Sequence, residues 1–509
     1  MILSKITQAL DAKVSGSVEI EITAVSCDSR NIELDPRPFT GSLFVAIPGE
    51  HVDGHSFVPR AVSAGAIAVL AEKETPSIDA VQVIVPDVRE AISKASDIFY
   101  GQPSKSLVTI GVTGTNGKTT TTYILESILR KAGHNPGVIG TVNYRYNGKT
   151  LPAPHTTPQA PELHKILREM NDAGVTHCVM EVSSHALEQK RAADCRFRAG
   201  VFTNLTHDHL DYHKTMDEYF RCKSILFEML SSSCGASVIN IDDSWGRKLA
   251  ERSNNAITFS LKEGASVFPK KASMLEGRTE AVISTLGGDM AISTHLVGEY
   301  NLQNILGAIG VALSLGIGIE AIIKGIASLE RVPGRLEKIE SVGIDVFRAY
   351  VDYAHTGDAL ERALMALKPV TSGKLITVFG CGGNRDRGKR PRMGEIAARL
   401  SDLTIVTSDN PRDEDPIEII KEIEAGIKGV KKFTPDERPS EKGYMVVPDR
   451  GEAISRAVSL AAKGDTLLVA GKGHEDYQII KGVKRHFDDF EVLSGLMHGN
   501  SAKIAAELG

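Results

Sequence analysis

The stretch TGTNGKTTTT, residues 113–122, decides the fold of the central part of this chain. It follows an apolar run, LVTIGV at 107–112, and precedes a helical pattern, YILESILRKAG at 123–133. A strand, a glycine loop, a lysine, a hydroxyl and a helix in this order form a cradle for phosphate, because glycines let backbone N–H groups approach an anion. Lys118 adds a positive charge, and Thr119 can offer its hydroxyl to Mg²⁺. The stretch therefore predicts nucleotide binding.

The match to the general P-loop pattern is imperfect. That pattern has a glycine five positions before Gly117, where this chain has Val112. For a bare GK[ST] motif, a glycine turn that binds nothing is the better interpretation. The strand before the loop, the helix after it and the run of threonines behind Lys118 favour a nucleotide site instead.

Composition narrows the class of protein. The chain has 509 residues, 42% of them hydrophobic, and at about 100–200 residues per domain this length predicts three or four domains. A net charge of −5 disfavours a general nucleic-acid binder, which usually carries a basic field. None of the six cysteines forms a CxxC pair, so the sequence contains no zinc framework or redox motif.

No segment has the pattern of a secretory signal or a membrane span. The first residues, MILSKITQALDAK, lack a basic start followed by a long apolar core. No charge occurs between Glu299 and Glu320, but polar residues such as Asn301 interrupt this stretch, which favours a buried helix. We therefore expect a cytoplasmic enzyme without a membrane span.

Strands and helices alternate along the chain, which predicts α/β sheets that are mostly parallel after the first hundred residues. A linker is expected at 102–104 and a second boundary at 331–335, and no GxGxxG follows a strand in the last part. The predicted strands are 20–25, 43–47, 67–70, 81–85, 107–112, 137–142, 177–182, 200–204, 237–241, 346–351, 375–379, 403–407, 444–447 and 466–470. The predicted helices include 161–173, 359–367, 393–400, 416–427 and 452–462.

Three loops of the middle part follow strands, at Gly114, Glu181 and Asn204, so they are expected to converge on one site. Mg²⁺ takes a few oxygen ligands besides substrate phosphates, and a carboxylate at a strand end near the phosphate loop suits it. The position of Glu181 at a strand end favours a metal-ligand role over the alternative that it is simply an exposed glutamate in a loop.

Two further features leave alternatives open. The segment TNLTHDHLDYH, at 203–213, is compatible with a zinc-like cluster, a polar loop or one histidine on a second Mg²⁺, and spacing alone does not choose among them. Lys223 lies in the helical pattern RCKSILFEML, where a lone lysine is ordinarily on a solvated face.

Three polar loops begin at predicted strand ends in the last part of the chain. They are GCGGNRDRGKRP at 380–391, SDNPRDEDP at 408–416 and GKGHEDYQ at 471–478. Arginines clamp carboxylates, and Asp and Glu hold ammonium groups, so a pocket with both signs fits a zwitterionic amino acid. Ordinary turn-rich loops are the alternative, but they do not explain three such loops at successive strand ends. The candidate ligands are Arg385, Asp409, Asn410, Arg412 and Glu475.

Taken together, these motifs resemble the Mur ligase family over nearly the whole chain and in the same order. TGTNGKTT is that family's own phosphate loop, which explains the misfit at Val112. DSR, GSLFVAIPG and HVDGHSF resemble its first domain, and HTTP, EVSSHALEQKR and NLTHDHLDYH resemble its central domain. EYNLQN, PGR and DYAHT follow in the expected places.

The resemblance implies an α/β protein of three domains. Residues 1–105 would form a small mixed α/β domain that binds UDP. Residues 106–332 would form the central ATP-binding domain, with a P-loop-type, mostly parallel sheet. Residues 333–509 would form a Rossmann-like, doubly wound domain that binds the amino acid. Nothing in the sequence demands more than a monomer.

The implied activity is ATP-dependent amide formation in peptidoglycan precursor synthesis, by way of an acyl phosphate. The implied substrates are UDP-N-acetylmuramoyl-L-alanyl-D-glutamate and an amino acid, and the cofactors are ATP, two Mg²⁺ ions and a carbamate on Lys223. Lys118, Lys223, Glu181 and His209 would be the catalytic set. The metal ligands would be Thr119, Glu181, His209 and carbamylated Lys223.

The same resemblance assigns the remaining ligands. ATP would contact Gly114, Thr115, Asn116, Gly117, Lys118, Thr119, Thr120, Asn301, Arg335 and Asp352. The muramoyl-dipeptide would contact Ser29, Thr156, Thr157, Ser183, Gln189 and Arg191. The amino acid would contact Arg385, Asp409, Asn410, Pro411, Arg412, Gly471 and Glu475.

The DNPR motif at 409–412 resembles the form that uses meso-2,6-diaminopimelate rather than L-lysine. Diaminopimelate carries a second carboxylate, which Arg412 and Asn410 can bind. Lysine would leave Arg412 without a partner, which is costly in a buried site. The alternatives are the same ligase with L-lysine, a sibling Mur ligase or folate polyglutamate synthase, and a binding protein with a degenerate site.

The chain also departs from the family pattern at two places. Gly357-Asp358 follows DYAHT where the family commonly has proline, and an extra DPRPFT follows Leu34. Neither is expected to touch a proposed ligand residue.

Overall fold

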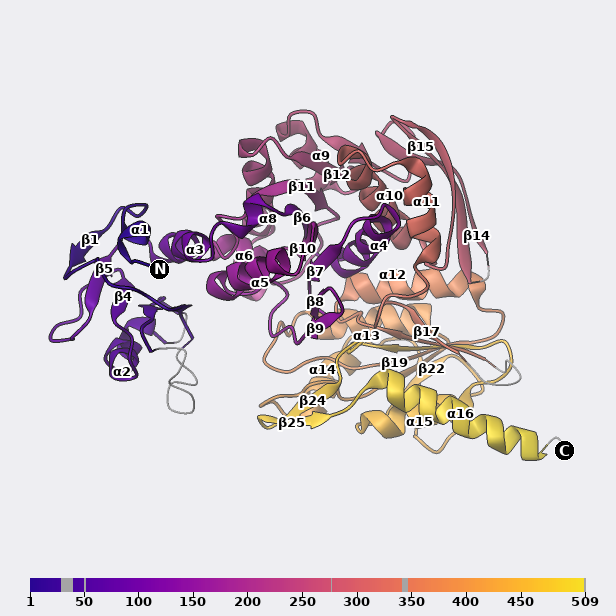
Figure 1. The fold of residues 1–509 in the computed structure, drawn as a ribbon. Coiled ribbons are helices and arrows are strands. Elements are labelled where there is room, and N and C mark those ends of the chain that lie inside the picture. The colour runs from indigo at the N-terminus through magenta and orange to yellow at the C-terminus, as the bar shows by residue number, and fades with distance from the viewer. Residues whose placement is uncertain (29–39, 50–51, 276, 341–346, 508–509) are drawn as a thin grey trace.

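The computed structural model describes residues 1–28, 40–49, 52–275, 277–340 and 347–507. It is an α/β protein with three main sheets (Figure 1). The first sheet lies at one end of the molecule, and the parts that contain the second and third sheets lie one above the other in this view. Ser29 and most of the DPRPFT insertion lie outside the described residues.

The first sheet has five strands in the order β1-β5-β4-β3-β2, and only β1 is antiparallel to its neighbour. The prediction of a strand over 20–25 is wrong except at Val25, because the main-chain groups of the preceding residues bond instead to the N-terminal segment. The predicted linker forms a short 3₁₀ turn, Pro103–Lys105. The elements are α1 Ser4–Thr7, β1 Lys13–Ser15, β2 Val25–Ser26, β3 Leu43–Val45, α2 Val58–Ser63, β4 Ala68–Ala71, β5 Val81–Ile84 and α3 Val88–Phe99.

The second sheet has eleven strands, and its middle, β13-β12-β11-β6-β10-β7, is parallel. β6 is buried along nearly its whole length, as expected of a parallel strand covered on both faces. The strands are β6 Val108–Thr113, β7 Pro136–Ile139, β8 Tyr144–Tyr146, β9 Lys149–Leu151, β10 His177–Glu181, β11 Phe197–Phe202, β12 Ala236–Asn240, β13 Ile257–Phe259, β14 Val267–Leu275, β15 Arg278–Thr285 and β16 Gly288–Thr294.

Antiparallel strands at both edges of this sheet were not predicted. β14, β15 and β16 form a meander on one side, and β8 and β9 form a hairpin on the other. β14 has mostly exposed side chains, so it lacks the apolar run that identified the inner strands.

The helices of this part cover both faces of the sheet. α10, which contains the charge-free stretch, is almost wholly buried, as predicted. The helices are α4 Lys118–Lys131, α5 Ala160–Asp172, α6 Ser184–Glu188, α7 Leu210–His213, α8 Met216–Ser232, α9 Ser244–Arg252, α10 Glu299–Ser314 and α11 Ile319–Ser328.

The third sheet has the order β17-β18-β23-β19-β20-β22-β21, and only β17 is antiparallel. A separate hairpin, β24–β25, was not predicted. The strands are β17 Glu337–Ile339, β18 Arg348–Asp352, β19 Leu375–Phe379, β20 Leu403–Val406, β21 Lys431–Phe433, β22 Gly443–Val446, β23 Thr466–Ala470, β24 Tyr477–Ile480 and β25 Val483–His486. The helices are α12 Gly357–Leu367, α13 Lys389–Leu400, α14 Pro416–Glu424, α15 Arg450–Leu460 and α16 Asp489–Glu507.

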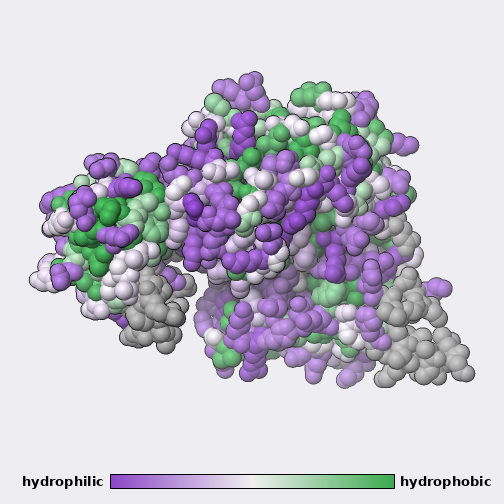
Figure 2. All heavy atoms as spheres, viewed as in Figure 1, coloured by the Kyte–Doolittle hydropathy of each residue, from purple (hydrophilic) through white to green (hydrophobic). Residues whose placement is uncertain are grey.

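Apolar side chains gather between the sheets and their covering helices. Separate buried clusters serve the first, second and third sheets, and each sheet has two of them. Figure 2 shows hydrophilic side chains over most of the face in view, with smaller hydrophobic patches among them. No helix in the described part of the chain is long and apolar enough to cross a membrane.

Candidate functional site

The phosphate loop joins β6 to α4 and has the backbone geometry that its glycines allow. Gly114 and Gly117 have φ values of +149° and +88°, which L side chains rarely adopt. A Cβ on Gly117 would lie 2.2 Å from Oδ1 of Asn304. The Lys118 ammonium donates to the carbonyls of Gly114 and Thr115, at 2.9 and 3.0 Å. Burial lowers the pKa of Lys118, and Glu181 opposes this shift.

The loop after β11 holds the phosphate loop in place. Thr115 N donates to Asn204 O, and Asn116 N donates to Asn204 Oδ1, both at 2.9 Å. Thr203 Oγ1 donates to Asn116 O at 2.6 Å. The expected convergence of these two strand ends is thus present in the structure.

Lys223 lies on α8 but not on a solvated face, so that interpretation is wrong. Its side chain is 1% exposed, and its ammonium donates to Gly114 O at 2.8 Å and lies over the Tyr219 ring. Among the described residues it forms no ion pair with a carboxylate. Burial, with the charge of Lys118, holds the pKa of Lys223 well below its ordinary value.

Glu181 is 1% exposed, which excludes the exposed-loop alternative. Its Oε1 accepts from Thr141 N at 3.0 Å, and its Oε2 accepts from Thr141 Oγ1 at 2.9 Å. The neighbouring Gly140 is required by space, because a Cβ there would lie 2.5 Å from Glu181 Oε1. The carboxylate is therefore held in one position beside the phosphate loop.

His209 caps the short helix α7 with φ +54°, and its ring is half exposed. Its ring packs edge-on against His185, and burial lowers its pKa. His213, by contrast, is buried and pairs with Ser184 Oγ at 2.8 Å. Of these two, His209 is the histidine more open to a ligand.

The residues proposed for the muramoyl-dipeptide form one hydrogen-bonded network. Thr156 Oγ1 lies 3.1 Å from Thr141 Oγ1, and Thr157 Oγ1 donates to Glu181 O at 2.8 Å. Arg191 Nη1 donates to Thr157 O at 2.9 Å. The remaining contacts join Ser183 to Thr157 and Arg191 to Gln189.

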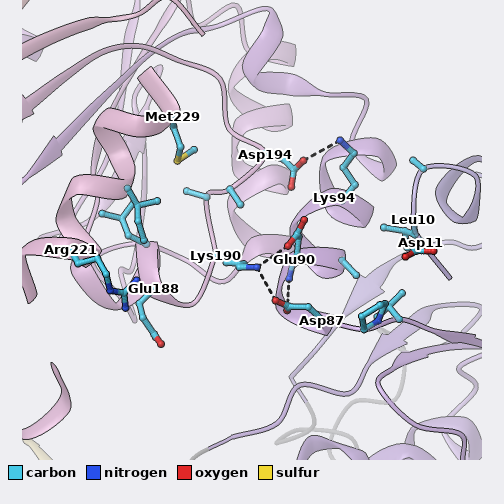
Figure 3. A pocket seen from close by; sticks show the side chains of 18 residues that line it. Leu10, Asp11, Asp87, Glu90, Lys94, Glu188, Lys190, Asp194, Arg221 and Met229 are labelled. Atoms are coloured by element: carbon cyan, nitrogen blue, oxygen red, sulfur yellow. Dashed lines mark hydrogen bonds and ion pairs between the residues drawn. The ribbon is translucent and has the colours of Figure 1, made fainter. Parts of the chain in front are cut away.

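Lys190 lies between Gln189 and Arg191 in the chain, and it links the loop after α6 to the start of α3. Its ammonium lies 2.8 Å from both Asp87 and Glu90 at the start of α3 (Figure 3). A second pair, Lys94–Asp194, joins the same parts of the chain. The pairs border a pocket of about 710 Å³ between α3 and α8. They were not predicted, because ion pairs between distant segments leave no local pattern.

The start of the C-terminal part closes over the phosphate loop. Arg335 Nη2 donates to Thr119 Oγ1 at 3.1 Å and lies over the Tyr353 ring. Asp352 accepts from Leu336 N at 2.6 Å, and burial raises its pKa. A cleft between the two parts is lined by Asn116, Gly117, Thr119, Thr120, Asn304, Arg335 and Asp352. Asn301 does not line this cleft; it is buried and donates to Val297 O at 2.8 Å.

The expectation that Gly357-Asp358 touches no proposed ligand residue is wrong. Asp358 Oδ2 accepts from Asn116 Nδ2 at 2.8 Å and from Thr206 Oγ1 at 3.3 Å. Asp358 lies in the first turn of α12, and packing of α12 against the central part brings it to the phosphate loop.

The three polar loops at the ends of β19, β20 and β23 do come together. Asn410 Nδ2 donates to Glu475 Oε2 at 2.8 Å, and a Cβ on Gly471 would lie 2.8 Å from Asp409 Oδ2. Arg412 Nη1 donates to Gly383 O at 2.6 Å in the first loop. Arg385, in the same loop, is exposed, and Pro411 is buried.

Two carboxylates and two guanidinium groups share this region, so their charges interact. Burial and the nearby Asp409 raise the pKa of Glu475. Burial and Arg385 lower the pKa of Arg412, while Asp409 and Glu475 oppose that shift. The arrangement can hold a ligand that carries charges of both signs.

The hairpin β24–β25 fixes the second loop and was missed by the sequence reasoning. Ile479 N donates to Asn410 Oδ1 at 2.8 Å, and Gln478 Nε2 donates to Asp409 O at 2.6 Å. Arg412 N donates to Ile479 O at 3.0 Å. The run YQII followed by a lysine-glycine turn was the available signal.

The donor groups beside the phosphate loop suit Mg²⁺. Among the described residues, no three or more His, Cys, Asp and Glu side chains gather so as to hold a metal ion by themselves. Mg²⁺ is commonly bound by one or two carboxylates together with substrate phosphates and water. A threonine hydroxyl at Thr119 and the fixed carboxylate of Glu181 are donors of that kind.

Comparison with known proteins agrees with this geometry. Residues 21–100, 112–312 and 334–473 match "Mur ligase family, catalytic domain", "Mur ligase middle domain" and "Mur ligase, glutamate ligase domain". A UDP-N-acetylmuramoyl-L-alanyl-D-glutamate--2,6-diaminopimelate ligase of Geobacter metallireducens is 45% identical, with 97% of each chain covered. The ligase of the same name from Geobacter sulfurreducens is 46% identical over 94% of this chain and 95% of its own.

Solved structures lead to the same family. A UDP-N-acetylmuramoyl-L-alanyl-D-glutamate--2,6-diaminopimelate ligase superposes with a TM-score of 0.67 at 31% identity and covers 98% of both chains. MurF from Thermotoga maritima, solved with ADP, shares the fold with a TM-score of 0.65 at 21% identity, over 94% of this chain and 98% of its own. The chain belongs to the Mur ligase family of ATP-dependent ligases that form amide bonds.

Proposed function

We propose that this chain joins meso-2,6-diaminopimelate to the D-glutamate carboxylate of UDP-N-acetylmuramoyl-L-alanyl-D-glutamate, with hydrolysis of ATP to ADP and phosphate. The observation that carries the proposal is the amino-acid loop, where the partly buried Arg412 interacts with the charges of Asp409 and Glu475. Near-full-length identity of 45–46% to relatives named for this reaction supports it.

In the proposed reaction the γ-phosphoryl group passes from ATP to an oxygen of the D-glutamate carboxylate, which gives an acyl phosphate and ADP. The amine of diaminopimelate then attacks the acyl carbon, and phosphate leaves as the amide forms. Two anions must meet in the first step, so positive charge at the phosphate loop is essential. Lys118 supplies it from within the loop, and Arg335 supplies it across the cleft.

The residues of the network have positioning roles. Thr156, Thr157, Ser183, Gln189 and Arg191 belong to the hydrogen-bonded network that includes Glu181, and they would orient the dipeptide end of the nucleotide substrate toward the phosphate loop. Ser29 is proposed on the resemblance alone. Contacts of Arg335 and Asp358 with the phosphate loop bring the C-terminal part over the reacting groups, which excludes water from the acyl phosphate.

Thr119, Glu181, His209 and a carbamate on Lys223 would hold two Mg²⁺ ions. When bound, Mg²⁺ supplies charge neutralisation between the phosphates and the carboxylate. Lys223 fits the carbamate role because it is buried, has no carboxylate partner in the described part of the chain and lies against the loop at Gly114. A buried amine favours the neutral form, which is the form that adds CO₂.

Diaminopimelate differs from lysine by one carboxylate, and Arg412 is the residue placed to bind it, with Asn410 beside it. Asp409 and Glu475 would bind ammonium groups, and Arg385 a carboxylate at the open side of the loop. Pro411 and Gly471 would shape the pocket. A lysine substrate would leave the partly buried Arg412 unpaired.

Phosphate release with ATP, Mg²⁺ and UDP-N-acetylmuramoyl-L-alanyl-D-glutamate tests the proposal, with meso-diaminopimelate and L-lysine supplied in parallel. Release with diaminopimelate alone is the expected result. Release with lysine alone would keep the ligase and discard the role of Arg412. No release with either amino acid would point to a sibling ligase.

The carbamate has its own test. The activity of enzyme kept free of CO₂ should fall and should return on addition of bicarbonate. Lys223→Ala should be inactive and regain activity with a short carboxylic acid that occupies the same space. Full activity of Lys223→Ala without such an acid would rule the carbamate out.

Three domains, 1–105, 106–332 and 333–509, are proposed on the same basis. The residues of each main sheet fall inside one of these ranges, at 13–84, 108–294 and 337–470. The monomeric state and the cytoplasmic location stay predictions of the sequence.

A further inference from the structure

Behind the amino-acid loops lies a buried ion pair that the proposed chemistry does not use. Arg450, the first residue of α15, and Asp489, the first residue of α16, are 1% and 0% exposed. Nε and Nη2 of Arg450 donate to the two oxygens of Asp489, each at 2.7 Å. Burial of such a pair costs desolvation energy and is often neutral for stability, so stability alone does not account for it.

The remaining donors of Arg450 reach two strand ends that carry the amino-acid site. Nη2 also donates to Ala470 O at 2.9 Å, and Nη1 donates to Ser408 O at 3.4 Å. Ser408 immediately precedes Asp409, and Ala470 ends β23 just before the loop of Glu475. One guanidinium therefore spans both segments.

The sheet itself does not join these two strand ends. β19 lies between β20 and β23, so no ladder hydrogen bonds run from β20 to β23. The segment just before Arg450 forms further hydrogen bonds with the end of β20, because Thr407 Oγ1 and Ser408 N both donate to Pro448 O, at 3.2 Å. Arg450 thus cross-links the two strands behind β19.

The charge of Arg450 also matters at this place. Asp409 and Glu475 repel each other when both are ionised, and both interact with the positive charge of Arg450. A planar guanidinium with several fixed donors can hold two carbonyls and a carboxylate at once, which a lysine cannot do.

We propose that Arg450, held by Asp489, is a positioning residue for the amino-acid substrate, because it sets the spacing between the Asp409 and Glu475 segments. The inference rests on the proposed function, since it assumes that these two segments bind diaminopimelate. Arg450 touches neither ATP nor the muramoyl-dipeptide in this scheme. Loss of Arg450 should therefore weaken the binding of the amino-acid substrate only.

The test compares Arg450→Lys, Arg450→Met and Asp489→Asn with the wild type in the phosphate-release assay. KM is measured for each of the three substrates, together with kcat and Tm. Misplacement of binding groups by about 1 Å costs up to about a hundredfold, so we expect KM for meso-diaminopimelate to rise about tenfold to a hundredfold. KM for ATP and for the UDP substrate should stay within about twofold of wild type, which is small beside the change expected for diaminopimelate.

Leu493→Ala is the matched control. Leu493 lies one turn along α16 from Asp489, is fully buried, and packs in an apolar cluster that does not include the ion pair. It should lower Tm without raising KM for diaminopimelate. If Arg450→Met does not fold, Asp489→Asn still tests the proposal, because it leaves the arginine in place.

The outcomes separate the two proposals. A wild type that releases no phosphate with diaminopimelate contradicts the proposed function before any variant is measured. An active wild type whose Arg450 and Asp489 variants keep a normal KM for diaminopimelate overturns the positioning role. The same holds if Leu493→Ala raises that KM as much as Arg450→Met does.

Discussion

The phosphate loop and the amino-acid site are built in different ways. The phosphate loop is one run of ten residues, 113–122, and its backbone shape depends on Gly114 and Gly117. The proposed amino-acid site takes its residues from three loops between 380 and 478, and most of its proposed ligand groups are side chains.

The difference lies in what holds each site. A contiguous loop is positioned by its own strand and helix, with the loop after β11 as support. The amino-acid loops need the order of the third sheet, the hairpin β24–β25 and the Arg450–Asp489 pair to bring them together. A site of the first kind can be recognised locally, whereas a site of the second kind depends on contacts between distant residues.

The largest expected effect is at the phosphate loop. Lys118→Ala removes the one ammonium that the loop itself supplies, and loss of such a preorganised donor costs about 10²–10³-fold in kcat. The measurement is phosphate release with all substrates present. Lys131→Ala, at the exposed end of the same helix, should keep wild-type turnover. Retained activity in Lys118→Ala would show that this loop is not required for the reaction.

Arg412→Ala tests the amino-acid side of the comparison. A charge-assisted hydrogen bond contributes about 1.5–3 kcal/mol, so kcat/KM for meso-diaminopimelate should fall about tenfold to a hundredfold. KM for ATP should not change, because the two sites are held separately. Arg485→Ala, exposed on the neighbouring hairpin, is the control and should behave as wild type. An equal loss for ATP would mean that the sites are not independent.

Gly117→Ala tests whether backbone shape defines the phosphate loop. An L side chain at φ +88° is strained by about 1–2 kcal/mol, and the new Cβ would also displace Asn304. KM for ATP should rise about tenfold. Gly133→Ala carries similar strain at φ +81° with nothing within 4 Å of the new Cβ, so it should lower Tm and leave KM unchanged. If both variants raise KM for ATP equally, the rise would reflect lower stability rather than the shape of the phosphate loop.

The smallest effect is expected where the two regions meet. Asp358→Ala removes the hydrogen bond to Asn116, and a partly exposed charged contact contributes about 0.2–1 kcal/mol, so KM for ATP should rise by at most about fivefold. Glu361→Ala on the same helix breaks an ion pair inside the C-terminal part and should not affect ATP. An unchanged KM in Asp358→Ala would show that the contact does not contribute to ATP binding.

Much of the fold could be predicted because buried parallel strands are continuous apolar runs. Residues 108–113 and 375–379 are such runs, and the helices that follow them were also recognised. β14 and the hairpin β24–β25 were missed, since half-exposed antiparallel strands have mixed composition. The candidate sites were proposed from motifs. The solvated-face interpretation of Lys223 was wrong, because its helix pattern does not reveal that its ammonium donates to a loop carbonyl.

Local chemistry therefore determined the phosphate loop, because glycines, a lysine and a threonine in one short run can form only a few structures. Residue types at strand ends also indicated a ligand with charges of both signs. Only the tertiary structure decided that Asp358 reaches Asn116, that Glu181 is held by Thr141 and that Arg450 links two strand ends. Those contacts join residues far apart in the chain, and their formation depends on how sheets and helices pack, which no local pattern records.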